Sequence, residues 1–190
     1  MANNDTSNVK LGVCKVFFGG VDLGFTKGGV EVTVETETHE VQVDQYGNTP
    51  ISEYVMGRTI TVAVPLAETT LDNLVATMPG AKLVTDSTAG TSKAIVPTGV
   101  GVNLLDFADE LVLVPKGVNG SLNYNDAVRV PKAATPGAMT FAYKLDEERI
   151  FNCNFKGYPV IEGNDEVLYQ VGTVTPSLTF EVSLLAIHYS

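Results

Sequence analysis

The sequence has no tryptophan, only two histidines and only two cysteines among its 190 residues. Two cysteines are too few for a disulfide framework, and no CxxC spacing indicates a metal site. We therefore interpret Cys14 and Cys153 as small core residues. Neither His39 nor His188 is accompanied by a nucleophile motif, and no HExxH, GxSxG or phosphate-binding glycine loop occurs. The sequence thus predicts a protein that is not an enzyme and that binds no metal and no cofactor.

Basic residues are also scarce, because 12 Lys and Arg face 22 Asp and Glu, for a net charge of −10. Binding to nucleic-acid phosphates or to an anionic membrane surface needs a basic patch, and the sequence contains none. No run approaches the ~18 apolar residues of a membrane helix. The polar start, MANNDTSNVK, does not resemble a secretory signal. We expect a protein made in a reducing cytoplasm that does not bind a membrane.

What the sequence does contain is a series of short apolar runs with strand periodicity. Hydrophobic residues make up 44% and charged residues 18%, which is typical of a folded protein, and the length suits one domain over 1–190. We expect a flexible N-terminal arm over 1–9 and a C-terminal strand or arm over 173–190. About eight or more strands with one helix indicate a mainly β fold, a β-sandwich or barrel with long loops. Strands are expected within 11–18, 81–86, 110–114, 127–134, 139–146, 149–155 and 166–172.

The stretch 28–65 has the clearest alternation, with Val30, Val32 and Val34 separated by polar residues. Val41 and Val43 repeat this pattern, so we predict a hairpin that turns around Glu37 and Thr38. In that register the polar face pairs four acids, and like charges directly across a ladder destabilise it by up to ~1 kcal/mol each. Either this register is wrong or the acidic face has a function. Its residues are Glu31, Glu35, Glu40 and Asp44.

Residues 45–58 are predicted to form a long loop that is unusually apolar for a solvent-exposed segment. Loops of ~12–15 residues inside a compact domain are usually functional or ordered by a partner. The alternative is that the loop folds back on its own domain. The candidate contact residues of this loop are Tyr46, Ile51, Tyr54, Val55, Met56 and Arg58.

One helix is predicted over 67–78, because Leu71, Leu74, Val75 and Met78 form an apolar stripe at helical spacing. Thr69 suits the N-cap position, with Asp72 completing a capping box, and Pro79-Gly80 ends the helix. The glycine- and serine-rich stretch 87–94 and the Asn/Gly-rich stretch 115–127 are predicted to be loops.

Several segments together resemble the tail tube (major tail) protein family of tailed bacteriophages. They are VDLGFTKGGVEVTVE (21–35), GNTPISEYVMGRTITVAVPLAETTLDNL (47–74), LLDFADELVLVP (104–115), FNCNFKGYPV (151–160) and LYQVG (168–172). The resemblance covers most of 20–172. It implies a structural virion protein, synthesised in the bacterial host cytoplasm, whose hexameric rings stack into a hollow tail tube. It also implies terminator and tape measure proteins as partners, and double-stranded DNA that passes through without specific binding.

The resemblance assigns roles to the two residue sets above. Glu31, Glu35, Glu40 and Asp44 are expected to face the lumen, where repulsion from DNA phosphates prevents sticking. The loop 45–58 is expected to reach a neighbouring subunit or ring. Two alternatives remain open at this point. One is a monomeric β-sandwich module that binds carbohydrate or a cell surface, and the other is the tube protein of a contractile injection apparatus with a protein cargo.

Overall fold

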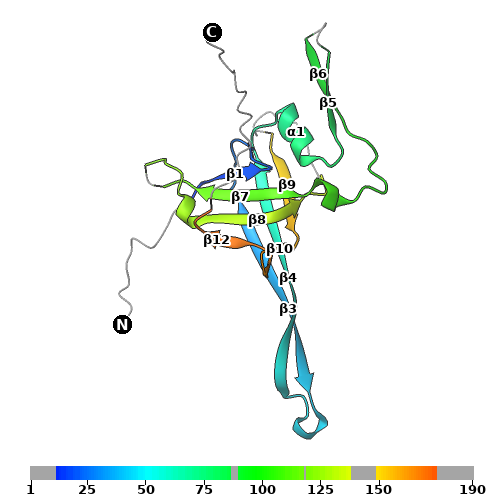
Figure 1. Cartoon of the computed structure of the whole chain (residues 1–190), viewed down its shortest axis with the longest axis vertical. Helices are drawn as coiled ribbons and strands as arrows, with labels where there is room; N and C mark the ends of the chain where they lie inside the picture. The colour runs from blue at the N-terminus through cyan, green and yellow to red at the C-terminus, as the bar shows by residue number, and fades with distance from the viewer. Residues whose placement is uncertain (1–11, 87–89, 118, 138–148, 175–190) are drawn as a thin grey trace, which may run out of the picture.

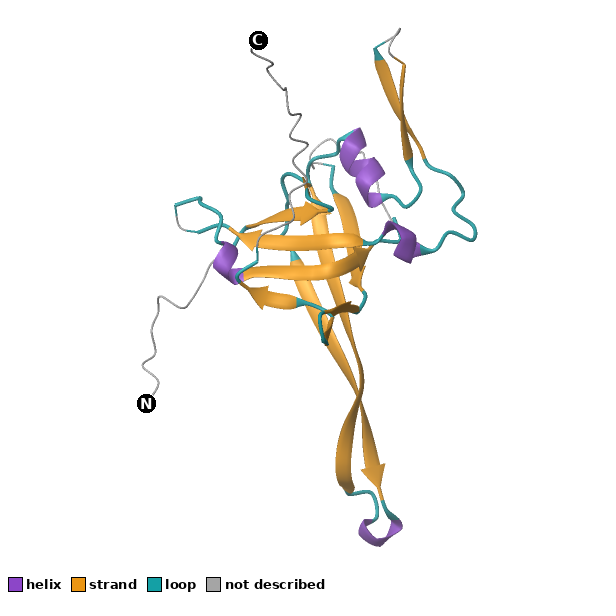
Figure 2. Ribbon diagram, in the orientation of Figure 1, coloured by secondary structure: helices purple, strands orange, loops and turns teal. Residues whose placement is uncertain are grey.

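The computed structural model describes residues 12–86, 90–117, 119–137 and 149–174, and it is mainly β with one short α-helix (Figures 1 and 2). The fold class predicted from the sequence is confirmed. The strands are β1 (Cys14–Phe18), β2 (Val21–Asp22), β3 (Glu31–Gln42), β4 (Pro50–Leu66), β5 (Lys82–Asp86), β6 (Thr91–Ile95), β7 (Asp109–Pro115), β8 (Ala127–Ala134), β9 (Phe151–Gly157), β10 (Val160–Glu162), β11 (Asp165–Val167) and β12 (Gln170–Gly172). The helix is α1 (Leu71–Thr77), and three 3-10 turns are η2 (Asp44–Tyr46), η3 (Leu104–Phe107) and η4 (Tyr124–Asp126).

One antiparallel sheet in the order β2-β1-β7-β8-β9-β4-β3, with β12 added to β8, folds over on itself. The fold line lies where β8 meets β9, since only Ala133 and Ala134 pair there, with Gly157 and Lys156. Figures 1 and 2 show β7 and β8 crossing over β9 and β4. The enclosed core therefore combines residues from both halves, as in a β-sandwich. Its largest fully buried side chains include Val16, Leu23, Ile60, Val62, Val64, Leu66, Leu111, Val130, Phe151 and Phe155.

The strands with one buried face follow the sequence prediction closely. In β9 buried and exposed residues alternate without exception, with Phe151, Cys153 and Phe155 inside. Phe155 meets Phe18 of β1 across the core, with ring centroids 5.0 Å apart. Residues 110–114 lie within β7, whose central four residues are all buried. These contacts between β9 and β1 hold the two layers of the folded sheet together.

The hairpin predicted around Glu37 and Thr38 is wrong. β3 runs without a turn from Glu31 to Gln42 and pairs along its whole length with β4, so that Thr38 lies opposite Val55. The polar link between the two valine runs is the middle of one strand. Both faces of this strand are exposed there, so its sequence shows no alternation of apolar and polar residues. The predicted loop 45–58 is likewise mostly strand, because β4 begins at Pro50.

The helix is shorter than predicted and buries a different face. It starts after Thr70, whose hydroxyl accepts a hydrogen bond from the Asn73 amide at 3.2 Å, so Thr69 is not the N-cap. Asn73 and Thr77 are its buried residues, whereas Leu71 is exposed. Leu74, Val75 and Met78 of the predicted apolar stripe are only partly buried, because the fully buried face of the helix is the one whose Asn73 amide bonds two backbone carbonyls.

Two further predictions are corrected. Residues 91–95 form β6 and pair with β5 (82–86), where a loop over 87–94 was predicted. The single strand predicted over 166–172 is divided between β11, which pairs with β10, and β12, which pairs with β8. The N-terminal arm 1–9, the strand predicted over 139–146 and the C-terminal segment 175–190 lie outside the described residues.

Candidate functional site

The most distinctive surface is the outer part of the β3–β4 hairpin, residues 34–59, which we call the arm. The inner part of β4 is covered by a third strand, because residues 61–66 also pair with β9. Beyond Ile60 the ribbon has only two strands and projects from the sandwich (Figure 1). Every residue from Glu31 to Glu40 in β3 is exposed, and in β4 from Pro50 to Thr59 only Ser52 is partly covered. An isolated two-stranded ribbon is marginally stable at best in water. Packing against a further surface would stabilise the arm.

Two irregularities and a compact tip shape the arm. The register shifts between Glu37 and Thr38 and again between Val41 and Gln42, which leaves Met56 and Ile51 of β4 without direct partners in β3. Such bulges increase local twist and interrupt the pairing of an edge with foreign strands. At the tip, Gly47 has φ 62° and its amide donates to the Asp44 carbonyl at 3.3 Å, which closes the η2 turn.

All six residues that the sequence placed in a partner-binding loop are found on the arm and are exposed. Tyr46 and Met56 are each 68% exposed and Tyr54 is 61% exposed, so most of the surface of these large side chains is in water. Large exposed apolar side chains gathered on one element indicate an interaction site or an aggregation liability. The set was predicted correctly as surface, but its members lie along a strand and at its tip. The remaining three are Ile51, Val55 and Arg58.

The four predicted acids do not share one face. Side chains alternate along β3, so Glu31 and Glu35 point to one face and Glu40 to the other. Asp44 lies in the η2 turn at the tip. Their partners also differ from the prediction, since Glu31 lies opposite Ala63, Glu35 opposite Thr59 and Glu40 opposite Glu53. The expected pairs Glu35 with Glu40 and Glu31 with Asp44 do not exist, because β3 does not turn back on itself.

The face that carries Glu31 and Glu35 continues across β4 and β9 as a polar surface. The ladders align Glu31 with Ala63 and Asn154, and Thr33 with Thr61 and Lys156. Asn152, Asn154 and Lys156 are the exposed residues of β9. Glu37, two residues beyond Glu35, lies on the same face opposite Gly57. Three carboxylates and one ammonium group thus lie among neutral polar side chains, without the directly opposed acid pairs that the sequence suggested.

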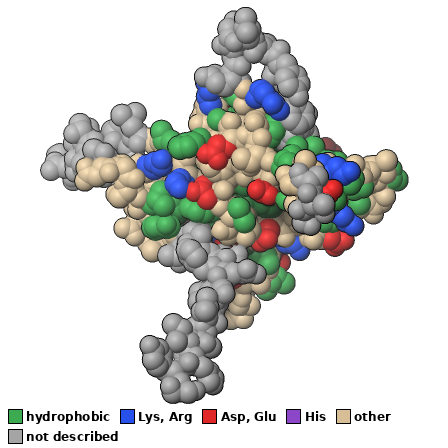
Figure 3. All heavy atoms as spheres, turned by 90° about the horizontal axis from the view of Figure 1, so that it is seen from above, with side chains coloured by type: hydrophobic (Ala, Val, Ile, Leu, Met, Phe, Trp, Pro, Cys, Tyr) green, Lys and Arg blue, Asp and Glu red, His purple; other side chains and the backbone are tan. Residues whose placement is uncertain are grey.

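A second exposed ribbon, the β5–β6 hairpin (residues 82–95), was missed by the sequence analysis. Only Ala94 of its ten strand residues is partly covered. Leu83, Val84 and Ile95 are between 41% and 48% exposed. The hairpin projects from the end of the molecule opposite the arm (Figure 1). Figure 3, which views that end, shows Lys and Arg side chains interspersed with hydrophobic ones.

The segments that carried the family resemblance are in direct contact in the fold. The loop after β2 runs beside the end of β4, with a bridge between Thr26 and Leu66 and a bond from the Ala67 amide to the Phe25 carbonyl at 2.8 Å. Glu68 accepts a bond from the Phe25 amide at 3.2 Å. A Cβ on Gly24, which has φ 84°, would lie 2.4 Å from Glu68, so this position requires glycine.

The buried amide of Asn73 connects these segments to α1. Its Nδ2 donates to the Leu23 carbonyl at 3.0 Å and to the Glu68 carbonyl at 3.1 Å. Buried polar groups must find partners of this kind, so the amide fixes the helix against the loop. The DLG and PLAETT motifs thus have a structural explanation that is independent of any function.

Arg129 of β8 organises the surface on the other side of the sandwich. It pairs with Glu110 of β7 and, at 2.9 Å, with Glu162 of β10, and it also donates to Gln170 of β12 at 3.0 Å. Burial lowers the pKa of Arg129, but the hydrogen bonds with Glu110 and Glu162 outweigh it and raise the pKa. A permanently charged guanidinium therefore connects four strands, with a network that is structural in kind.

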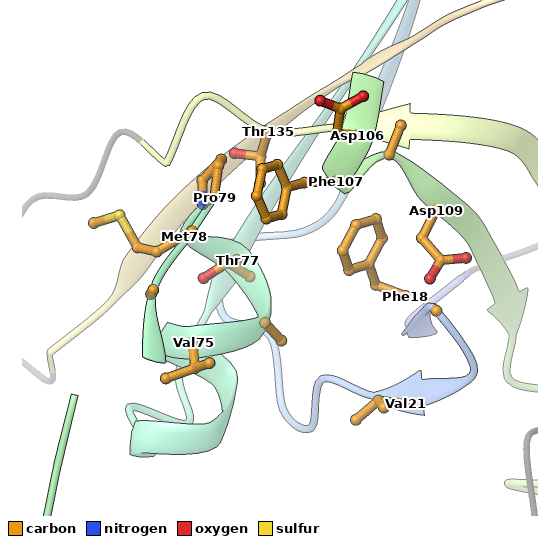
Figure 4. A pocket seen from close by; sticks show the side chains of 15 residues that line it. Phe18, Val21, Val75, Thr77, Met78, Pro79, Asp106, Phe107, Asp109 and Thr135 are labelled. Atoms are coloured by element: carbon orange, nitrogen blue, oxygen red, sulfur yellow. The ribbon is translucent and has the colours of Figure 1, made fainter. Parts of the chain in front are cut away.

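The hollow beside the helix shows no catalytic arrangement among its described lining residues. It is a cavity of about 360 Å³ between α1 and the β1–β7 edge, and the rings of Phe18 and Phe107 line it (Figure 4). Asp109 accepts a bond from the Glu110 amide at 2.7 Å, and Asp106 accepts one from Asn103 at 3.4 Å. Because both carboxylates have structural partners, the lining offers no free acid–base pair.

The remaining titratable candidates also lack the features of an active site. Cys14 and Cys153 are free thiols, and burial raises the pKa of both, which is the opposite of what a nucleophile needs. His39 is exposed on the arm opposite Tyr54, and His188 lies outside the described residues. Within the described ranges, no cluster of three His, Cys, Asp or Glu could hold a metal ion. The described part of the chain also has no helix with the length and hydrophobicity needed to span a membrane.

No protein-family model matches the chain, and a search of curated proteins finds no similar one. The functional argument therefore depends on the surfaces described above. Two exposed ribbons at opposite ends of a well-packed sandwich are the features that its own core does not explain.

Proposed function

We propose that this chain is a structural subunit that assembles into stacked hexameric rings, which form the hollow tail tube of a bacteriophage virion. The observation that supports this most directly is the arm. A ribbon with tyrosine, valine and methionine side chains in water gains stability only when a second molecule covers it. A contact between different surfaces of identical subunits closes into a ring or extends as a filament, and a tube needs both.

We infer that the subunit folds without help from the arm. The core residues come from β1, β4, β7, β8 and β9, with Leu23 from the segment after β2, and those of β4 begin at Ile60. The arm can therefore change partners while the sandwich stays intact. This division between a stable body and an extended contact element is what a subunit needs if it is made as a monomer and polymerises later.

We assign the polar face of β3, β4 and β9 to the lumen, with Glu31, Glu35 and Glu37 as its carboxylates. Neutral polar side chains and a few negative charges repel DNA phosphates weakly and offer no cationic site, so double-stranded DNA slides through without binding. Glu40 and Asp44 lie elsewhere on the arm and belong to contacts between subunits in this proposal. Terminator and tape measure proteins are the expected partners at the tube ends and in the bore.

The test is electron microscopy of the purified full chain over a range of concentrations, with light scattering. We expect rings and hollow tubes of uniform bore that increase with concentration. Particles that stay monomeric at every concentration would contradict the proposal and favour the carbohydrate-binding alternative, which a glycan screen then examines. Tubes with a protein in the bore and no DNA passage would favour the tube of a contractile injection apparatus.

A further inference from the structure

One face of the arm carries two carboxylates with no ion-pair partner among the described residues, and Arg58, opposite Thr36, lies further along the same face. Glu40 of β3 and Glu53 of β4 are direct cross-strand neighbours, and both are exposed. Neither side chain takes part in an ion pair or hydrogen bond in the described part of the chain. Like charges in this position destabilise a ladder, and the arm has little packing to offset that cost. The next pair on the same face is Thr38 with Val55, which adds an exposed apolar side chain.

One face of the β5–β6 hairpin has the complementary character. Lys82 lies opposite Ile95 and Val84 lies opposite Lys93, so these four side chains share a face. Both lysines are exposed, Val84 is 41% exposed and Ile95 is 48% exposed. Asp86 at the outer end of the same face leaves a net charge of +1. The face therefore offers two ammonium groups beside an apolar pair.

These two faces cannot meet within one molecule. The arm and the β5–β6 hairpin project from opposite ends of the longest axis, with the sandwich between them (Figure 1). A contact between them joins two copies in the same orientation, and the same two surfaces remain free at the ends of the pair. Repetition of this contact therefore produces a head-to-tail stack.

We propose that the Glu40–Glu53 face of the arm docks on the Lys82–Lys93 face of the β5–β6 hairpin of a second copy of this chain. Val55 packs against Val84 and Ile95, and the two carboxylates pair with the two lysines. This inference rests on the proposed tube, because it identifies the receiving surface for the arm in the next layer. Charge complementarity fixes the orientation, and the apolar contact excludes water from the ion pairs.

Charge reversal tests the contact. The variants E40K/E53K and K82E/K93E each place like charges in the interface, and we expect each to raise the critical concentration for polymerisation at least tenfold. The quadruple variant restores opposite charges with exchanged positions, and we expect it to polymerise at close to the wild-type concentration. The matched control, D165K/E166K, changes two exposed acids of β11 and is expected to polymerise like the wild type.

A cross-linking experiment measures the contact itself. The double variant V55C/V84C is expected to give a ladder of covalent oligomers under mild oxidation, whereas V55C and V84C alone give dimers at most. The wild type, whose thiols are buried or half-buried, is expected to give none. If the wild type forms tubes but the charge variants polymerise equally well, or the quadruple variant is not rescued, or no ladder forms, this inference is overturned and the proposed function stands. A wild-type chain that forms no polymer and no ladder overturns both.

Discussion

At the scale of single residues, the fold depends on a few buried polar side chains and on glycine at crowded positions. Asn73 is the clearest case, because it is 6% exposed and its side chain satisfies two backbone carbonyls from different segments. Thr77, one turn later, donates to the Asn73 carbonyl at 2.7 Å and is also buried. The buried face of α1 is thus a hydrogen-bonding face.

Asn73→Ala leaves the Leu23 and Glu68 carbonyls without these donors, and we expect a loss of ~1–3 kcal/mol in the free energy of unfolding. Urea denaturation measures this loss, at a protein concentration below the one at which the chain polymerises. The control is Asn48→Ala at the exposed tip of the arm, for which we expect no change beyond ~0.5 kcal/mol. Equal unfolding midpoints for the two variants would show that the Asn73 amide does not secure the helix.

Two strand glycines differ in how much space surrounds their Cα atoms. A Cβ on Gly157, where β4, β8 and β9 converge, would lie 2.3 Å from Ile60 Cγ2 and 2.9 Å from Val130 Cγ1. A Cβ on Gly57 of the arm would meet nothing within 4 Å. We expect Gly157→Ala to destabilise the fold by ~1–3 kcal/mol through overpacking. Gly57→Ala is expected to be neutral or to stabilise the fold by up to ~1 kcal/mol, because alanine lowers the conformational entropy of the unfolded chain. Thermal unfolding of both variants checks the contrast, and a similar melting temperature for the two would contradict it.

At the scale of elements, the sequence predicts those strands that bury one face. β9 and β7 were predicted because alternation or a continuous apolar run records their burial, and the Phe151, Cys153 and Phe155 face was correct. The arm and β6 were not predicted, because both faces of a projecting ribbon are in water and no period-2 pattern is required. The TETHE segment in β3 therefore resembled a turn. The six residues predicted to contact a partner are exposed on the arm, and their contact with another subunit stays a prediction.

The division between body and arm predicts what shortening the arm will do. Glu37 and Gly57 are direct partners, so residues 38–56 can be replaced by an Asn-Gly turn that closes the hairpin at that pair. We expect a monomer whose melting temperature stays within a few degrees of the wild type, because no residue of the core is removed. Sedimentation is expected to show no polymer at concentrations where the wild type polymerises.

Two outcomes would contradict this expectation. A shortened chain that still forms tubes would place the assembly contact elsewhere. A shortened chain that unfolds would show that the arm belongs to the folding unit. The second outcome would also weaken the view that the sandwich is complete on its own.

At the scale of the whole molecule, the body and its two ribbons place different chemistry on different sides. The ribbons lie at opposite ends of the long axis (Figure 1), and a polar face spans β3, β4 and β9. Stacking along the ribbons leaves that face free to line a bore. In the proposed assembly, the net charge of −10 opposes random association of subunits, and complementary charges at the two ends set their orientation. The proposed tube, with a bore that does not retain DNA, is consistent with this arrangement.

The lumen assignment predicts how charge reversal changes DNA retention. In assembled tubes, E31K/E35K places cationic groups where Glu31 and Glu35 lie, and we expect a short fluorescent DNA duplex to be retained and protected from nuclease. The retention should be lost as salt rises, because phosphate contacts release counterions. Wild-type tubes should retain none, and D165K/E166K tubes should at most bind DNA that the nuclease digests. If E31K/E35K tubes assemble normally but protect no more DNA than wild-type tubes, the polar face of β3, β4 and β9 does not line the bore.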